Sequence, residues 1–514
     1  MPEHLRALPV ILALAAVVFA LAKAPACAIA TTSRDFERRR NLWVGLTLAA
    51  FLAHNFWIYI IVAAALLLAG SRREPNTLAM FFFLLFALPL ISAEVPGFGV
   101  VNFLFEIDYG RLLALTVLLP AYLSLRKQPG IEPFGRPLPD KFIAGYMLLT
   151  VLLMLTYSPF TSTLRHGVFY SFIDIFLPYY VASRYLKDLP GFRDALMAFA
   201  VAAMVLSAIG AFESVWQWLL YSSLDRALGV RWGGGVPLMR GENLRAAGTA
   251  GQAIPMGYVI AVAIGLFLYL RRSVPSPLLW GLGLTLLIVG EVAPLSRGPW
   301  VGAAAMVLVF VATGPSPGVR LAKLGLFGVL ALPLLLATPA GNAIIDHLPF
   351  IGTIEETNVN YRKLLLEISF QVIQDNLLFG STNWSQSAAM QELVQGQGMI
   401  DLVNSYVGVA LSSGLVGLSL FAGFFIAVEI GIYKAMRKAA DKNAEPYVLG
   451  QALFATLLGI LIIIFTVSSI HFIPVVYWSV AGLGVAYARM VAPAKAPAVK
   501  SSAGFRPASA KRKG

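Results

Sequence analysis

Three arginines of this chain lie in surroundings that give no ordinary reason for a charge. Arg240 and Arg245 belong to the glycine-rich stretch "MRGENLRAAGTAGQAIP", and Arg297 lies in "APLSRGPW", between two apolar segments with almost no loop. A guanidinium group binds phosphate oxygens bidentately and keeps its charge at any working pH. The three residues therefore predict an anion site, and a lipid-linked diphosphate is the anion to expect at a membrane face. The alternative is that each arginine only snorkels or forms a salt bridge.

Glycines follow two of these arginines. Gly248 and Gly251 permit turns with positive φ and a close approach of the backbone to a ligand. A helix beginning near Pro255 would direct its first N–H groups towards the same anion. Gly248 is therefore a candidate substrate contact, although a short glycine-rich turn before a helix is common without a ligand.

A second cluster of polar residues opens the stretch "DLVNSYVGVALSSGLVGL", which begins at residue 401 and returns the chain to apolar sequence. Amide, carboxylate, hydroxyl and aromatic groups suit a sugar, so Asp401, Asn404, Ser405 and Tyr406 are candidate contacts of a hydroxyl-rich ligand. In the alternative interpretation Asp401 only caps the following helix, with Asn404 and Ser405 in its first turn. The two interpretations are compatible with each other.

Composition identifies the environment in which these residues work. The chain has 514 residues, of which 58% are hydrophobic and 13% are charged, and its mean hydropathy is +0.76. Soluble domains carry roughly 25% charged residues. The sequence therefore predicts an all-α, polytopic membrane protein with about 12 to 14 spanning helices of ~20 apolar residues each. The candidate spans are 8–30, 42–69, 77–93, 108–124, 141–157, 168–183, 194–220, 253–270, 278–293, 299–313, 321–338, 403–433, 446–468 and 472–490.

The distribution of charge gives the expected orientation. The net charge is +13, but lysine and arginine gather in short loops between apolar segments, which is typical of cytoplasmic loops and not of a nucleic-acid site. The basic tail 491–514 carries no acid, and we expect it to be disordered, cytoplasmic and close to anionic lipid. One stretch does not fit this orientation, because the basic sequence "SRDFERRRN" (33–41) would lie on the external side of the membrane. Either the segment 42–69, which His54 and Asn55 interrupt, does not cross the membrane as a simple span, or the segment 8–30 lies differently in the membrane.

Two polar segments, 221–252 and 339–402, interrupt the apolar sequence and suggest how the chain is divided. We expect N-terminal membrane helices over 1–220, a core that carries both polar segments over 221–433, and C-terminal membrane helices over 434–490. The segment 339–402 is longer than ordinary connections, which indicates a functional element.

Part of this long segment has the periodicity of an amphipathic helix. In "YRKLLLEISFQVIQDNLLFG" Leu364, Ile368 and Val372 share one face, and Gly380 is placed to end the helix. We expect this helix to lie across the mouth of the bundle and to cap a cavity.

The sequence contains no pattern that indicates a metal or a cofactor. Cys27 is the only cysteine, and the histidines have no metal-ligand spacing between them. The carboxylates Glu106 and Asp108 in "FEIDYGR" could pair with Arg111, an interpretation that we prefer to a catalytic dyad.

Taken together, these features resemble the O-antigen ligase/polymerase superfamily. The resemblance rests on "RxxGTxxxxxP" from Arg245, on "SRGPW" leading into an apolar segment, on an "R…LLFG" helix in the large external loop, and on "NSYVGVALSSGLVGLSLF" re-entering the membrane. It covers residues 240–430 and depends on the order and spacing of the motifs. The N-terminal half is similar only in being multi-helical.

The resemblance implies a GT-C-like membrane glycosyltransferase of the bacterial inner membrane, active at its periplasmic face. Its substrates would be a polyprenyl-diphosphate-linked glycan donor and an acceptor, and a flippase and a chain-length regulator of the same pathway would be further partners. Arg245 and Arg297 match the arginines expected to hold the donor diphosphate without a metal. Arg362 matches the arginine that opens the loop helix.

One departure from the family concerns the general base. Ligases of the superfamily carry histidine before the Asn-Ser-Tyr-like motif, whereas this chain has Val403 there. Asp401, or a loop carboxylate such as Glu392, would have to take the acceptor proton, unless no strong base is used. The missing histidine favours a polymerase of lipid-linked repeat units, making an exopolysaccharide or O-antigen, over a ligase that transfers glycan to lipid A-core.

Two other classes of protein remain as alternatives. A solute transporter predicts ionisable residues near the middle of its spans, whereas the three arginines here lie at one face, on the side of the long loop. A non-catalytic scaffold of a glycan-export complex is compatible with the same sequence.

Overall fold

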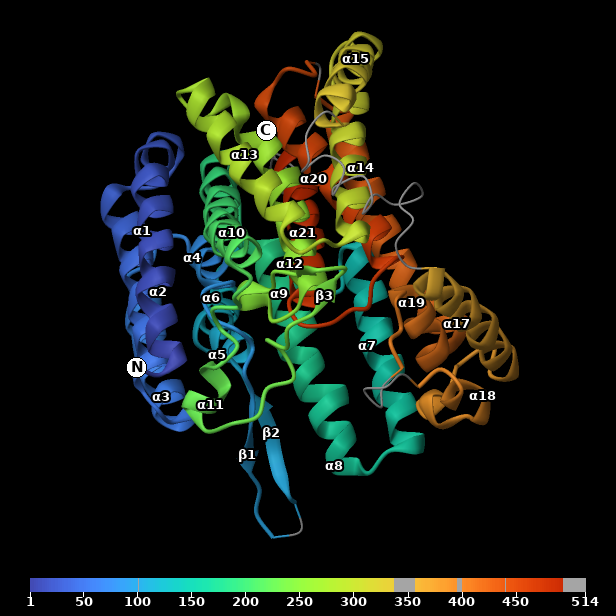
Figure 1. The fold of residues 1–514 in the computed structure, drawn as a ribbon. Coiled ribbons are helices and arrows are strands. Elements are labelled where there is room, and N and C mark those ends of the chain that lie inside the picture. Colours follow the sequence, from blue (N-terminus) through green and yellow to red (C-terminus); the bar gives the residue numbers. More distant parts are fainter. Residues whose placement is uncertain (100, 337–355, 395–399, 440, 493–514) are drawn as a thin grey trace, which may run out of the picture.

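Helices, most of them apolar, make up most of the described structure. The computed structural model describes residues 1–99, 101–336, 356–394, 400–439 and 441–492, and Figure 1 shows most helices running between two ends of a bundle. Six described helices are long and apolar enough to cross a membrane. The prediction of an all-α polytopic membrane protein is confirmed, while the total of about 12 to 14 spans stays a prediction. The six are α1 (Glu3–Ile29), α7 (Leu138–Tyr157), α10 (Leu189–Trp216), α12 (Ala253–Tyr269, continued by a 3-10 turn to Arg272), α19 (Ser405–Met436) and α20 (Glu445–Ile464).

Shorter or less apolar elements complete the bundle. Three short helices are apolar, namely α3 (Phe56–Ser71), α13 (Pro277–Val292) and α14 (Arg297–Thr313). The other helices are α2 (Ser33–Leu52), α4 (Thr77–Leu84), α5 (Tyr109–Leu113), α6 (Leu119–Lys127), α8 (Phe160–Ser162), α9 (Leu177–Tyr185), α11 (Leu224–Leu228), α15 (Pro317–Leu336), α17 (Glu356–Asp375), α18 (Ala388–Gln391) and α21 (Ile473–Val491), with π-helical turns η1 (Ala114–Leu118) and η2 (Thr163–Phe176). Two antiparallel hairpins pair β1 (Ala93–Pro96) with β2 (Phe103–Ile107) and β3 (Met239–Arg240) with β4 (Asn243–Leu244).

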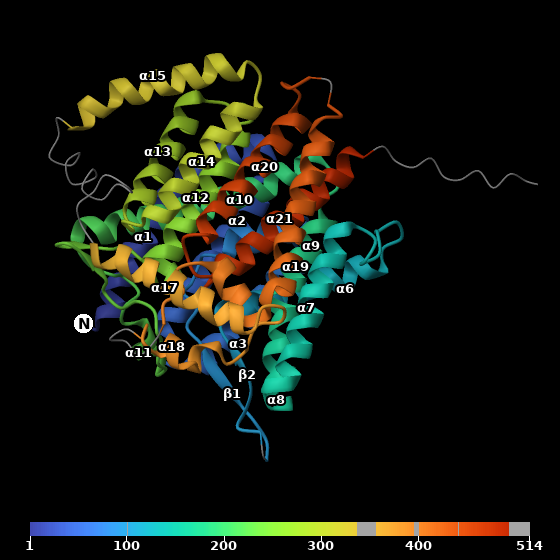
Figure 2. The same cartoon turned by 90° about the vertical axis from the view of Figure 1, so that its right-hand side faces the viewer.

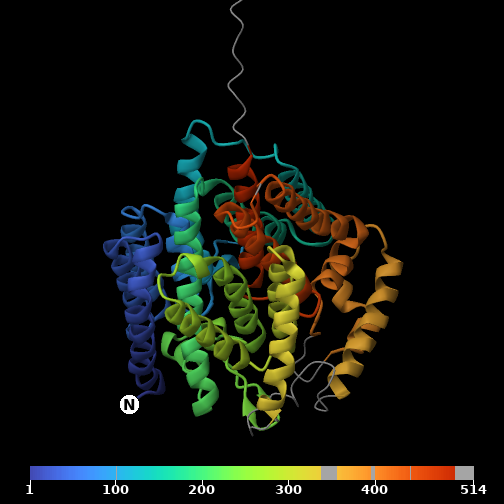
Figure 3. The same ribbon diagram turned by 90° about the horizontal axis from the view of Figure 1, so that it is seen from above.

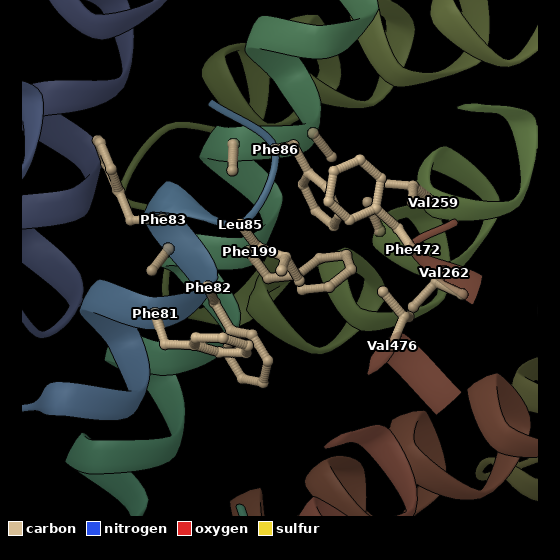
Figure 4. Packing of buried hydrophobic residues seen from close by; sticks show 14 of the residues in the cluster. Phe81, Phe82, Phe83, Leu85, Phe86, Phe199, Val259, Val262, Phe472 and Val476 are labelled. Carbon is tan, nitrogen blue, oxygen red and sulfur yellow. The ribbon is translucent and has the colours of Figure 1, made fainter. Parts of the chain in front are cut away.

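Aromatic side chains fill the centre of the bundle where α4, α10, α12 and α21 meet (Figure 4). Phe86 packs edge-on against Phe199 and Phe472, with ring centroids 5.3 and 5.4 Å apart. Edge-to-face pairs of this kind contribute about 0.5–1.5 kcal/mol beyond the burial of their surface. The core therefore fixes Phe472, and with it the loop that precedes α21, relative to α4 and α10.

Basic loops come together at one end of the bundle, called here the basic end. Arg39 donates to both carboxylate oxygens of Asp194, at 2.7 and 2.8 Å, and to Glu74 at 2.7 Å. All three residues are buried. This network ties α2 and α10 to the loop before α4. Other pairs at the same end are Lys187–Gln128, Arg193–Glu445 and Arg272–Asn443.

The first helices resolve the disagreement over residues 33–41. The segment 42–69 is broken, because the Asn55 side chain caps α3 with hydrogen bonds to two amides at 2.9 and 3.2 Å. Glu3 accepts a hydrogen bond from Trp218 at 3.1 Å, at the end of the bundle opposite the basic end. The helix α1 starts at this opposite end and runs the length of the bundle. Residues 33–41, which follow α1, therefore lie at the basic end with the other arginines. The expectation that 42–69 does not cross simply is confirmed.

The helix α15 is not packed among the other helices. Figure 2 shows it lying across the top of α13 and α14, and Leu326, Phe327 and Leu330 are 60–70% exposed. The expected span 321–338 therefore does not run alongside its neighbours over the residues that are described. Of the expected segments, 339–355, 395–399 and 493–514 lie outside the described residues.

Figure 3, looking down on the bundle, shows α1, α2 and α3 in blue at one side and α17 in orange at the other, with the central helices between them. The end of the bundle at which α10 finishes and α12, α14 and α19 begin is called here the site end. The division of the chain into 1–220, 221–433 and 434–490 stays a prediction.

Candidate functional site

The turn between α13 and α14 gathers the three predicted arginines at the site end. Arg245 Nε donates to the carbonyl of Pro294 at 3.1 Å, and Arg240 Nη1 donates to the carbonyl of Leu295. Arg297 is the first residue of α14, two positions after Leu295, and all three arginines are half-buried. The fold therefore brings together residues from two separate segments of the sequence.

A helix N-terminus adds to the positive potential of this turn. The helix α14 has 17 residues, and the residue before it, Ser296, makes no side-chain capping bond in the described structure. The first N–H groups of a helix have no partner within the helix, and its dipole places partial positive charge there. A second helix, α12, begins at Ala253, close to the start expected near Pro255. The arrangement suits a phosphate or diphosphate.

A buried carboxylate holds the segment that carries Arg245. Glu213 of α10 is fully buried and accepts hydrogen bonds from three backbone amides, among them those of Ala247 at 3.0 Å and Gly248 at 2.8 Å. Gly248 has a φ of 49°, and a Cβ at this position would lie 2.6 Å from Leu206 Cδ1. Glycine is therefore required for packing on α10, and its amide is engaged within the protein. The role of Gly248 as a substrate contact stays a prediction.

We expect Glu213→Ala to destabilise the protein by several kcal/mol, because each buried amide left without an acceptor costs about 1–3 kcal/mol. Glu213→Gln keeps one side-chain oxygen and should show an intermediate effect. The thermal midpoint of the detergent-solubilised protein measures both changes. Glu242→Ala, which removes an exposed carboxylate from the same segment, is the matched control. A wild-type midpoint for Glu213→Ala would show that Glu213 does not hold the segment that carries Arg245.

Asn404 caps α19. Its Oδ1 accepts hydrogen bonds from the amides of Tyr406 at 2.9 Å and Val407 at 3.2 Å, and the residue is buried. The alternative interpretation that Asp401 provides the cap is wrong, because a capping side chain must reach the second or third amide of the helix. Asp401 lies three residues before the capping residue Asn404, outside the helix.

The next two residues attach the start of α19 to its neighbours. Ser405 Oγ donates to the carbonyl of Val467 at 2.8 Å, and Tyr406 OH donates to the carbonyl of Leu461 at 3.1 Å. Both hydroxyl groups therefore serve internal packing. Contacts of Asn404, Ser405 and Tyr406 with a sugar stay predictions.

The α20–α21 loop (465–472) joins the two predicted clusters. Asp401 is exposed, and its Oδ1 accepts a hydrogen bond from Ser468 Oγ at 3.3 Å. At Gly298, the second residue of α14, a Cβ would lie 2.4 Å from Thr466 Oγ1. The same loop thus contacts both the candidate base and the start of the arginine-bearing helix.

The amphipathic helix predicted in the long segment is observed as α17. Ile368 and Val372 are buried as expected, but Leu364 is 44% exposed, and Leu365, at 1%, takes its place. Residues 364 and 365 fit a helical stripe with 368 and 372 equally well, and packing against α18 and α19 selects Leu365.

The start of α17 lies beside Asp401. The amide of Asp401 donates to Tyr361 OH at 3.2 Å, and Tyr361 OH lies 3.3 Å from the carbonyl of the same residue. Arg362, the next residue of α17, has an exposed side chain. The structure therefore brings the predicted loop arginine to the same end as Asp401, while its contact with substrate stays a prediction.

Two glycines that are separated in the sequence, Gly380 and Gly414, meet in the structure. Gly414 interrupts α19 with a φ of 63°, and the segment 377–381, which follows α17, docks into the interruption. A Cβ at Gly380 would lie 2.6 Å from the backbone nitrogen of Gly414. Three backbone hydrogen bonds join the segments: Leu415 to Leu377 at 2.9 Å, Val416 to Leu378 at 3.1 Å, and Ser381 to Leu411 at 2.8 Å.

We expect Gly414→Ala to release the segment 377–381 from α19. The new Cβ would lie 2.3 Å from the backbone of Leu378, and the positive φ adds about 1–2 kcal/mol of strain. Faster cleavage of α17 and α18 in limited proteolysis would show the release. Gly281→Ala, within α13, is the control because nothing lies within 4 Å of its added Cβ. Equal cleavage rates in both variants would refute the docking.

A cavity of about 200 Å³ lies beside the start of α21. Most of its lining is apolar, and its ionisable side chains are Asp108, Arg111, Asp174 and His471. Arg111 lies 3.2 Å from Asp174, 3.8 Å from Asp108 and 3.9 Å from Glu106, which confirms the expected pairing. Burial lowers the pKa of the His471 imidazole. Sequence reasoning missed Asp174 and His471, although an ionisable residue within or beside an apolar segment is a signal for both.

The fold and the site define a polytopic α-helical membrane protein with a cluster of arginines at one end. Residues 282–422 match the protein family described as O-Antigen ligase. The matched stretch contains Arg297, α17 and Asp401 and continues past the interruption of α19, whereas Arg240 and Arg245 precede it. The resemblance to the O-antigen ligase/polymerase superfamily is therefore confirmed over these residues, which supports a glycosyl-transferring enzyme that uses lipid-linked glycans. No curated protein matches the chain.

Proposed function

We propose that the protein is an inner-membrane glycosyltransferase that polymerises polyprenyl-diphosphate-linked repeat units at the periplasmic face. The basic end is then cytoplasmic, as the positive-inside pattern requires, and the site end is periplasmic. The observation that carries the proposal is the convergence of Arg240, Arg245 and Arg297 on one turn at the start of α14.

In the proposed reaction an acceptor hydroxyl oxygen attacks the anomeric carbon of the donor glycan. The bond between this carbon and the diphosphate oxygen breaks, and the diphosphate leaves with the electron pair. Arg245 and Arg297 offset the negative charge that develops on the leaving group, which lowers the free energy of the transition state. The acceptor proton passes to a carboxylate.

Asp401 is the carboxylate that we assign to this proton transfer, because it is exposed and faces the loop that contacts α14. We expect Asp401→Asn to lower kcat by about 100-fold or more while donor affinity is retained. Turnover of a purified lipid-linked repeat unit measures the effect. Glu392→Gln is the comparison, because Glu392 is also exposed in the long segment. Full activity of Asp401→Asn would remove Asp401 from the mechanism.

Val403, at the position where ligases carry histidine, favours the polymerase, whereas the description of the matching family favours an O-antigen ligase. Membrane vesicles supplied with a lipid-linked repeat unit would distinguish the two. Ladders of increasing chain length indicate a polymerase, and glycan on lipid A-core indicates a ligase. Flux of a solute without bond formation would refute both and indicate a transporter.

A deletion strain offers an independent test. Single-repeat products would support the polymerase, because the donor is made but not extended. Accumulated full-length lipid-linked polymer would support the ligase. A flippase and a chain-length regulator are the partners that we propose for the polymerase.

A further inference from the structure

A crevice of about 810 Å³ opens at the basic end between α2 and α3, away from the candidate functional site. Its lining combines apolar side chains with three arginines, two carboxylates and an amide. These residues are Leu42, Leu66 and Pro75; Arg34, Arg38 and Arg73; Asp35 and Glu37; and Asn41.

Both carboxylates of the crevice are already paired within the protein. Glu37 lies 2.5 Å from Lys23 Nζ, and Asp35 lies 2.8 Å from Arg38. Arg38 is also paired with Glu74 at 2.8 Å. These acids therefore do not neutralise the two remaining arginines of the crevice.

Arg34 and Arg73 are the remaining arginines. Both have exposed side chains, and neither forms a salt bridge with any other residue that the structure describes. They come from the start of α2 and from the residues just after α3, and both line the same crevice. Two guanidinium groups without internal counter-ions make the rim attractive to a phosphate group.

Leu42, Leu66 and Pro75 give the crevice an apolar part. A Cβ at Gly70 would lie 2.5 Å from Leu42 Cδ1, so α2 and α3 pack closely near the end of α3. Leu66 lies on the same face of α3 as Val62 and Ile58, which precede it at intervals of four residues. Val62 is 42% exposed and Ile58 is 54% exposed. An apolar surface therefore continues from the crevice along α3.

We propose that this crevice is a binding site for an anionic phospholipid, with its phosphate between Arg34 and Arg73 and an acyl chain along Leu66, Val62 and Ile58. A soluble phosphate would use the rim but leave the apolar surface uncovered. Because basic loops face the cytoplasm, the lipid would come from the cytoplasmic leaflet, where basic pockets between membrane helices bind anionic headgroups. The site does not depend on the chemistry at the opposite end.

Native mass spectrometry of the full-length protein with phosphatidylglycerol tests the proposal, with phosphatidylcholine as the reference lipid. We expect the double variant Arg34→Gln/Arg73→Gln to bind phosphatidylglycerol roughly 10- to 30-fold more weakly, with phosphatidylcholine unaffected. The double variant Arg72→Gln/Arg271→Gln removes the same charge from exposed arginines outside the crevice and should remain within about twofold of wild type.

Three results would overturn the proposal. Equal losses in the two double variants would indicate diffuse attraction to the basic end. Unchanged binding in Arg34→Gln/Arg73→Gln would exclude the crevice. Displacement of phosphatidylglycerol by inorganic phosphate at equal concentration would show that the apolar surface adds nothing. Thermal midpoints close to wild type, expected because all four arginines are exposed, would confirm that both variants are folded.

Discussion

Replacing Arg297 with glutamine is expected to lower the rate of glycan transfer about 100- to 1,000-fold, which is the usual effect of removing one preorganised charge-stabilising donor. Glutamine fills much of the same space but cannot balance charge on a departing diphosphate. Arg297 begins α14, where the helix dipole acts in the same direction. The loss should fall mainly on kcat, because the charge on the bridging oxygen is largest in the transition state. Arg245→Gln should behave similarly.

Two comparisons make this prediction specific. Arg297→Lys keeps the charge but not the bidentate geometry, so we expect an intermediate rate. Arg231→Gln removes an exposed arginine from the polar segment 221–252 and should leave the rate near that of wild type. Rates measured with purified protein and a lipid-linked repeat unit provide the readout. A wild-type rate for Arg297→Gln would exclude the diphosphate site and the proposed function with it.

The second large effect is expected at the basic end. Asp194→Ala should lower the free energy of unfolding by roughly 3–5 kcal/mol, because it leaves Arg39 buried without one of its two carboxylate partners. Arg39 donates to both oxygens of Asp194, and Glu74 alone cannot replace both hydrogen bonds. The network joins α2, α10 and the loop before α4, so the loss should affect the packing of the first helices against the rest of the bundle.

Denaturation in detergent micelles, followed by tryptophan fluorescence, measures this change. Glu37→Ala is the control. It also removes one carboxylate from an ion pair, but the side chains of Lys23 and Glu37 are 38% and 40% exposed, and pairs accessible to solvent contribute little. Similar midpoints for Asp194→Ala and the wild type would show that the network is not a source of stability.

Several features of this protein could be predicted from local sequence. Hydropathy identifies a membrane protein because a segment of apolar residues must be covered by lipid or by other helices wherever it lies. Arg297 was identifiable because a charge beside apolar segments is costly. The start of α12 and the amphipathic character of α17 follow from patterns within about 20 residues.

The predictions that proved wrong concern positions where two nearby residues fit the local sequence pattern equally well. Asp401 and Asn404 are both suitable capping residues, and only the point at which α19 starts decides between them. Leu364 and Leu365 fit the same helical stripe, and the neighbours of α17 select one. The break between α2 and α3 was visible in the sequence at Asn55, but the contact between Glu3 and Trp218 was needed to orient the first helices.

The sequence by itself determined the medium, the helical class and the residue types available for binding an anion, because hydrophobicity, helical period and charge are properties of short segments. Only the tertiary structure decided which of these residues meet. It placed Arg240 and Arg245 on the carbonyl groups before Arg297, joined Gly380 to Gly414, and brought Asp174 and His471 to one cavity. Such contacts depend on the packing of helices that are distant in the chain, which no local pattern specifies.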